Sequence, residues 1–168
     1  LSHYDNATLY NDSIVAQIVK RFQKQDAIVI YVPDHGEECY EENRGFICRN
    51  HSAEIDWPLA HYEFEIPFWI YCSSKYIRNH RDIYRQIRKA KDKRFMTDAL
   101  PHLLLYLAGI ETPTYKEEYN ILSPKYDEMR PRILKNSADY DKLRDAHLEK
   151  IKKEESKKVK KKKEGEKA

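Results

Sequence analysis

Four consecutive residues, Asp34-His35-Gly36-Glu37, are the part of this sequence best suited to chemistry. They follow the apolar, β-branched run at residues 27–32, which predicts a buried strand. Pro33 ends that strand because it lacks a backbone N–H. An aspartate beside an imidazole suits a divalent metal such as zinc, and ligands of open α/β sheets bind where strands end. The same residues also suit an ordinary surface turn with His35 in solvent.

Three longer stretches surround this motif, and together they resemble one known family. YVPDHGEE, HYEFEIPFWIYCS and TDALPHLLLYLAGI are similar to the C-terminal part of the catalytic domain of phosphoethanolamine transferases, which modify lipid A and lipopolysaccharide core. These enzymes form part of the sulfatase-like branch of the alkaline phosphatase superfamily. The resemblance covers roughly residues 1–145, and HYDNATLYNDSIVAQIVKRF points to the phosphoethanolamine branch.

The resemblance implies a two-step, zinc-dependent (Zn2+) transfer. Phosphoethanolamine would pass from phosphatidylethanolamine to a zinc-bound threonine, and then to lipid A or to lipopolysaccharide core. Asp34 and His35 match two of the zinc ligands. The nucleophilic threonine is expected upstream of Leu1, so no catalytic residue is assigned within this chain and we expect the chain alone to be inactive. Thr8 is expected to be structural.

The segment from residue 38 to residue 64 has no sustained hydrophobic period and is predicted to be a long irregular loop. The resembled family places a histidine here that contacts the metal or the transferred phosphate. His61 fits that position, with His51 as the second choice, and either could be a solvated loop residue. Glu37 and Glu38 could bind an ammonium group or face water.

Hydrophobic periodicity predicts an α/β fold with a mostly parallel sheet covered by helices on both faces. The resemblance implies the version of this fold found in alkaline phosphatases and sulfatases. The expected elements are a helix at residues 5–23 capped by Asp5 or Asn6, a second strand at 66–72, a basic helix at 75–93 and a buried apolar helix from Thr97 to Gly109. The resemblance implies that residues 1–145 are the C-terminal part of a catalytic domain, and composition predicts that residues 146–168 are a lysine-rich, disordered tail.

Charge is unevenly distributed. The net charge is +3, but residues 150–168 carry ten lysines against four glutamates. The rest is therefore mildly acidic, and we do not expect nucleic-acid binding. No apolar run approaches the roughly 18 residues that cross a bilayer. The resemblance nevertheless implies transmembrane helices before this segment, an inner-membrane location with the domain facing the periplasm, and a monomer. Cys39 and Cys48 could form a disulfide in that compartment, or remain reduced.

Two alternatives stay open from the sequence. A sulfatase or phosphoglycerol transferase would share D-H-G-E, although the C-x-P-S-R signature of sulfatases is absent. The chain could also be a non-catalytic α/β binding domain with the lysine tail as an electrostatic anchor.

Overall fold

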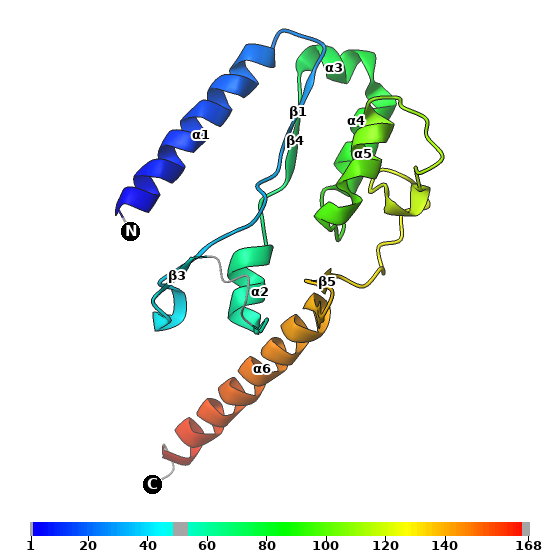
Figure 1. The fold of residues 1–168 in the computed structure, drawn as a ribbon. Helices are drawn as coiled ribbons and strands as arrows, with labels where there is room; N and C mark the ends of the chain where they lie inside the picture. The colour runs from blue at the N-terminus through cyan, green and yellow to red at the C-terminus, as the bar shows by residue number, and fades with distance from the viewer. Residues whose placement is uncertain (1, 49–53, 166–168) are drawn as a thin grey trace. The chain divides into compact units, whose positions relative to one another are not determined.

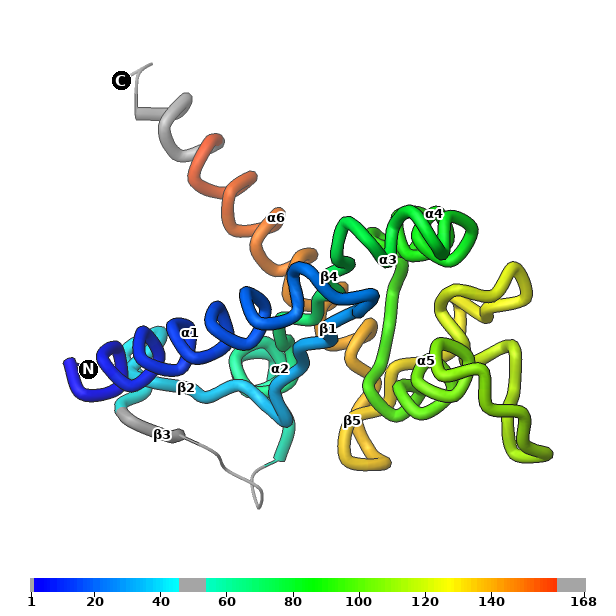
Figure 2. The backbone as a smooth tube through the Cα atoms, turned by 90° about the horizontal axis from the view of Figure 1, so that it is seen from above, coloured from blue at the N-terminus to red at the C-terminus, as the bar shows by residue number. Residues whose placement is uncertain are grey.

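A computed structural model of the chain describes residues 2–48 and 54–165. His51 lies outside the described residues, and so does the side chain of Cys48, so the structure tests neither the Cys39–Cys48 disulfide nor its reduced alternative. Figures 1 and 2 show the elements. In chain order they are α1 (Ser2–Phe22), β1 (Ile28–Tyr31), β2 (Glu38–Cys39), η1 (Glu41–Asn43), β3 (Phe46–Cys48), α2 (Trp57–Phe64), β4 (Trp69–Cys72), α3 (Ser74–Asn79), α4 (Arg81–Ala90), η2 (Thr97–Ala99), α5 (Leu100–Leu107), η3 (Glu117–Tyr119), β5 (Ile133–Leu134), β6 (Ala138–Asp139) and α6 (Tyr140–Gly165).

The chain forms two compact units, and each is built from two separate stretches. The first unit comprises Leu1–Pro33 and Pro67–Arg130, and the second comprises Asp34–Ile66 and Pro131–Ala168. The D-H-G-E motif therefore belongs to the second unit, together with α2 and α6.

Two strands form the sheet of the first unit. β1 and β4 pair along their whole length, with Ile28 opposite Cys72 and Tyr31 opposite Trp69. The pairing is antiparallel, so the predicted parallel arrangement is wrong for these strands. The chain leaves at the end of β1 and returns at that same end to begin β4, which forces opposite directions. An apolar run indicates that a strand is buried, but it carries no information on whether the strand pairs in parallel or antiparallel. Both strands are half-buried.

α1 leads directly to β1 in both views (Figures 1 and 2). It begins at Ser2, so the proposed caps Asp5 and Asn6 lie inside the helix and that prediction is wrong. Val15 and Val19 are half-buried and Ile18 is exposed, so the apolar stripe is partly covered within the described structure.

The basic helix predicted at 75–93 is in fact two helices that meet at His80, whose φ of −125° and ψ of 52° interrupt the helical backbone. Ser73 caps the first of them, because its Oγ accepts a hydrogen bond from the N–H of Tyr76 at 3.0 Å. Gly109, with φ at +65°, follows α5 in the predicted left-handed conformation. Leu104 is 45% exposed, so the predicted burial of α5 on all sides is wrong.

The core of the first unit lies where these helices meet the segment after η3. The fully buried Leu103 packs with Ala90, Ile121 and Leu122, and half-buried aromatic residues surround them.

The second unit is organised around α2 and α6. Asp56 caps α2 by accepting a hydrogen bond from the N–H of Leu59 at 3.0 Å, and Pro58 occupies the first turn. Leu59 and Ala60 pack against Tyr140 of α6 and against residues of the β5–β6 hairpin. The prediction of an irregular loop at 38–64 is therefore wrong for α2 and for the paired β2 and β3.

α6 runs continuously from Tyr140 to Gly165, through the boundary expected at residue 145 and through most of the segment expected to be disordered. Lysine, glutamate and alanine are good helix formers, and Lys153 faces Glu149 one turn away at 3.6 Å. Among the residues that the structure describes, none of the helices is long and apolar enough to cross a bilayer.

Candidate functional site

Asp34 and His35 converge at the turn that follows β1 in the chain. Oδ2 of Asp34 lies 3.3 Å from Nε2 of His35, and Oδ1 accepts a hydrogen bond from the His35 backbone N–H at 3.2 Å. The aspartate side chain is 85% exposed, whereas the imidazole is 25% exposed. The pair therefore presents one oxygen and one nitrogen to the same point at the surface of its unit.

The carbonyl of Gly36 fixes the orientation of this imidazole. Nδ1 of His35 lies 2.8 Å from Gly36 O. A carbonyl only accepts hydrogen bonds, so Nδ1 is the donor in this contact and Nε2 is the ring nitrogen left to bind a metal. A histidine that ligates a metal through one nitrogen uses the other in this way.

Gly36 is also where the motif touches α2. Its N–H donates to the carbonyl of Glu63 at 2.8 Å. A Cβ at position 36 would lie 2.2 Å from the carbonyl oxygen of Tyr62. The turn is therefore pressed against backbone, and only a residue without a side chain fits.

Glu38, which directly follows the D-H-G-E motif, has a structural role that the sequence did not reveal. Glu38 is fully buried, and Arg44 places Nε 2.6 Å from its carboxylate while NH1 lies 2.6 Å from Asp56. Burial raises the pKa of Glu38, and the charge of Arg44 opposes that rise. Burial acts on Asp56 in the same direction, but the hydrogen bonds from Arg44 and from the N–H of Leu59 outweigh it and lower the pKa of Asp56. Glu38 therefore does not face water, and the signal that could have revealed this is an arginine six positions further along the chain.

His61 lies on α2, not in a loop. Its Nδ1 is 3.0 Å from Oε1 of Glu65, and its ring stacks on Trp57 at a centroid distance of 5.5 Å. The hydroxyl of Tyr140 donates a hydrogen bond to the same Glu65 oxygen. Burial tends to raise the pKa of Glu65, but these two partners lower it, while burial and the contact with Glu65 raise the pKa of Tyr140 to about 12. His61 is thus oriented by a carboxylate, separately from the Asp34–His35 pair.

The donor set of Asp34 and His35 fits two corners of a zinc site. Tetrahedral zinc with bonds of about 2.0–2.1 Å holds neighbouring ligand atoms about 3.3 Å apart, and the two donor atoms here are separated by 3.3 Å. Within the described part of the chain, no group of three or more such side chains is gathered. These residues can therefore supply part of a zinc site, with further ligands coming from elsewhere.

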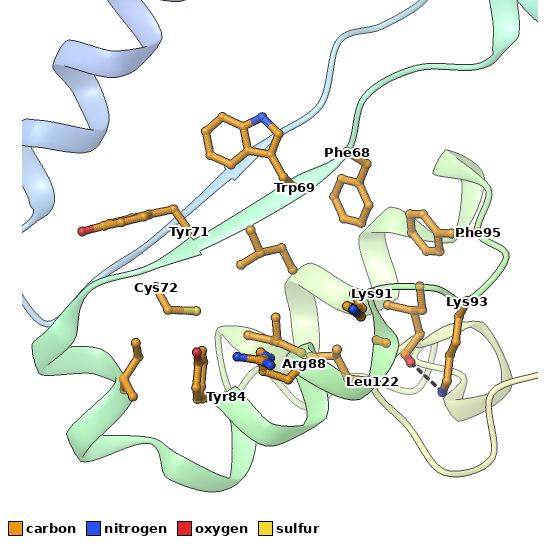
Figure 3. A pocket seen from close by; sticks show the side chains of 15 residues that line it. Phe68, Trp69, Tyr71, Cys72, Tyr84, Arg88, Lys91, Lys93, Phe95 and Leu122 are labelled. Carbon is orange, nitrogen blue, oxygen red and sulfur yellow. Dashed lines mark hydrogen bonds between the residues drawn. The ribbon is translucent and has the colours of Figure 1, made fainter.

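A separate cavity of about 430 Å³ lies in the first unit (Figure 3). Aromatic and aliphatic side chains of β4 and α4 form its walls, and the Lys93 ammonium donates a hydrogen bond to the carbonyl of Ile121 at 3.1 Å. Asp34, His35 and His61 are not among the residues that line it. The predicted site and this cavity are therefore different features.

Comparisons with known proteins agree with the resemblance. Residues 1–110 match the sulfatase family. Phosphoethanolamine transferase EptC of Escherichia coli O18:K1:H7 (strain RS218 / NMEC) is 32% identical over 128 residues, which are 74% of this chain and 21% of that protein. The Kdo(2)-lipid A phosphoethanolamine 7''-transferase of Escherichia coli K12 is 30% identical over 95 residues, which are 55% of this chain and 16% of that protein. The chain thus spans about a fifth of these relatives, and the similarity predicted from its motifs is confirmed.

Solved structures extend this similarity to the fold. The crystal structure of the C-terminal periplasmic domain of EptC from Escherichia coli matches with a TM-score of 0.65 and 30% identity, over 83% of this chain and 40% of that one. The same domain in complex with zinc matches equally well, over 39% of its chain. The matches fit an alkaline phosphatase-like α/β fold, although the β1–β4 pair seen here is antiparallel.

Proposed function

Because the chain belongs to the sulfatase family, we propose that it is the C-terminal part of a zinc-dependent phosphoethanolamine transferase. The observation that supports this most is the convergence of Asp34 Oδ2 and His35 Nε2 at zinc-like spacing. The relatives of this chain are phosphoethanolamine transferases, and one related domain has been crystallised with zinc.

In this proposal Asp34 and His35 are two zinc ligands. Gly36 O holds the proton of His35 on Nδ1, which leaves Nε2 to bind the metal. Zinc bound there would polarise the phosphoryl oxygens and lower the pKa of the attacking hydroxyl.

The remaining parts of the reaction are carried over from the relatives as proposals. Phosphatidylethanolamine is the donor, and lipid A or lipopolysaccharide core is the acceptor. A threonine that precedes this segment carries the phosphoethanolamine between them. The complete protein is a monomer in the inner membrane, with this domain facing the periplasm. The segment by itself is inactive, because it supplies two ligands and no nucleophile.

We assign the substrate-side histidine to His61, with His51 as the alternative. Oε1 of Glu65 lies 3.0 Å from Nδ1 of His61, which leaves Nε2 as the ring nitrogen that can face a substrate. When both ring nitrogens carry a proton, Nε2 can donate a hydrogen bond to a phosphoryl oxygen as negative charge develops there.

Zinc binding by the chain itself tests the ligand assignment. In competition with a chromophoric chelator, we expect one weakly bound zinc per chain and at least about tenfold weaker binding in His35→Ala. The matched control is His80→Ala, because His80 also faces an aspartate, with Nε2 3.4 Å from Oδ1 of Asp26. Equal binding by His35→Ala and the wild type would remove His35 from the site.

Transfer activity tests the reaction. In the complete protein, we expect His35→Ala to lower the transfer of a fluorescent phosphatidylethanolamine headgroup to lipid A by at least about 100-fold. His80→Ala should retain the activity. Hydrolysis of a sulfate ester in place of this transfer would contradict the proposed substrate class.

A further inference from the structure

The last helix, α6, has a first part that packs into a core and an outer part that is exposed. Its first two turns belong to the core of the second unit: Tyr140 is buried, Leu143 packs beside it, and His147 stacks on Trp57 at a centroid distance of 5.2 Å. From Leu148 to Val159 every residue is exposed. This outer part lies beyond residues 1–110, which match the sulfatase family.

An apolar stripe continues along the outer part. Leu148, Ile151 and Val159 are 45%, 38% and 54% exposed. At 3.6 residues per turn, these three positions and Glu155 fall within about 80° of one another around the helix axis. The stripe is thus one face of the helix, with a single carboxylate in its middle.

Lysines flank this stripe. By the same helical period, Lys152 and Lys158 lie on either side of the stripe, where long side chains can reach past apolar contacts to a charged plane. Residues 150–163 contain nine lysines and two glutamates. The backbone is helical throughout, so these charges are spread over about 21 Å.

We propose that the outer part of α6 binds the surface of an anionic phospholipid bilayer, lying along it with the stripe of Leu148, Ile151 and Val159 at the headgroup boundary. A basic helix with an exposed apolar face is the pattern of interfacial helices. Nucleic acid would use the lysines but would leave the apolar stripe without a partner. The inference goes beyond the proposed transferase, since it involves neither the zinc ligands nor any reacting group.

The charge requirement is tested with vesicles. The intact chain is mixed with vesicles of phosphatidylcholine containing 30% phosphatidylglycerol, and with vesicles of phosphatidylcholine alone. We expect sedimentation with the first and not with the second, because each lysine near an anionic surface strengthens binding about fivefold. Replacing Lys152, Lys153, Lys157 and Lys158 with glutamine should weaken binding by at least about 100-fold.

A control variant changes the net charge equally at another helix. It replaces four exposed basic residues of α4, namely Arg81, Arg85, Arg88 and Lys89, with glutamine. This variant should sediment with the anionic vesicles nearly as the wild type does. Equal losses in the two quadruple variants would assign binding to overall charge and would overturn the proposal.

The apolar requirement is tested by a matched pair. Glu155→Leu completes the stripe, whereas Glu154→Leu makes the same chemical change on another face of the helix. Both variants should bind anionic vesicles about fivefold more tightly, because each has lost one negative charge. Glu155→Leu should gain at least about tenfold more, because its new side chain is buried at the interface.

Three further results would overturn the proposal, and circular dichroism of each variant confirms that its helix is intact. The first is equal binding of the two leucine variants, because the stripe would then have no role. The second is equal sedimentation with neutral and anionic vesicles. The third is tighter binding to duplex DNA than to anionic vesicles at equal phosphate concentration, which would make α6 a nucleic-acid element. Zinc affinity and transfer activity are measured separately, so failure here leaves the proposed function standing.

Discussion

Replacing Gly36 with alanine is the sharpest perturbation that the turn offers. The added Cβ would lie 2.2 Å from the carbonyl oxygen of Tyr62, whereas such contacts are essentially never shorter than 3.0 Å. Backbone occupies both sides of this contact, so no flexible side chain can move aside. The turn and α2 must separate by at least about 0.8 Å, which stretches the hydrogen bond from Gly36 N–H to Glu63 O beyond a useful length.

The cost follows from these two effects. Overpacking costs about 1–3 kcal/mol, and losing a hydrogen bond between enclosed backbone groups costs a similar amount. We expect Gly36→Ala to lower the free energy of unfolding by about 3 kcal/mol and the melting temperature by about 6–12 °C. Because Gly36 O also orients the His35 ring, zinc affinity should fall about 10–100-fold.

Urea denaturation followed by circular dichroism and a zinc titration check both effects. Gly45→Ala is the matched control, because Gly45 has φ at +85° and a Cβ added there would meet nothing within 4 Å. It should cost about 1 kcal/mol through backbone strain alone and leave zinc affinity unchanged. If Gly36→Ala is as stable as Gly45→Ala and binds zinc like the wild type, the reasoning about close approach is refuted.

Two further predictions concern contacts within each unit. Ser73→Ala should destabilise the chain by about 1–2 kcal/mol in urea denaturation, because the buried hydroxyl that accepts from Tyr76 N–H is lost. Ser74→Ala, at the exposed neighbouring position, should be nearly neutral. Tyr140→Phe should be less stable than the wild type near neutral pH, because it loses the hydrogen bond to Glu65. The difference in stability between the two proteins should disappear as the pH rises from 10 to about 12, since the folded pKa of Tyr140 is raised to about 12. It should also disappear as the pH falls through the lowered pKa of Glu65. A difference that is constant across pH would contradict the assignment.

The sequence predicted the candidate turn but not its surroundings. Side-chain types made Asp34 and His35 candidates for a metal site, and the resemblance of the flanking stretches favoured that interpretation over an ordinary surface turn. The direction of the following strand was not readable, since apolar content reflects burial, whereas direction depends on where the intervening segment returns. The same limit applies to Glu38, whose burial depends on Arg44 reaching back to it from six positions further along the chain.

Among the elements that the sequence analysis missed, α2 matters most for understanding the candidate site. Its start was readable: Asp56 followed by Trp57-Pro58 combines a cap with a proline in the first turn, and the polar composition of the surrounding segment obscured it. The position of α2 explains why residue 36 is a glycine, because the turn packs against the backbone at the end of that helix. His61 acquires a fixed orientation as well, because Glu65 lies one turn further along. Recognising the start of α2 would therefore have indicated how the candidate residues are held in place.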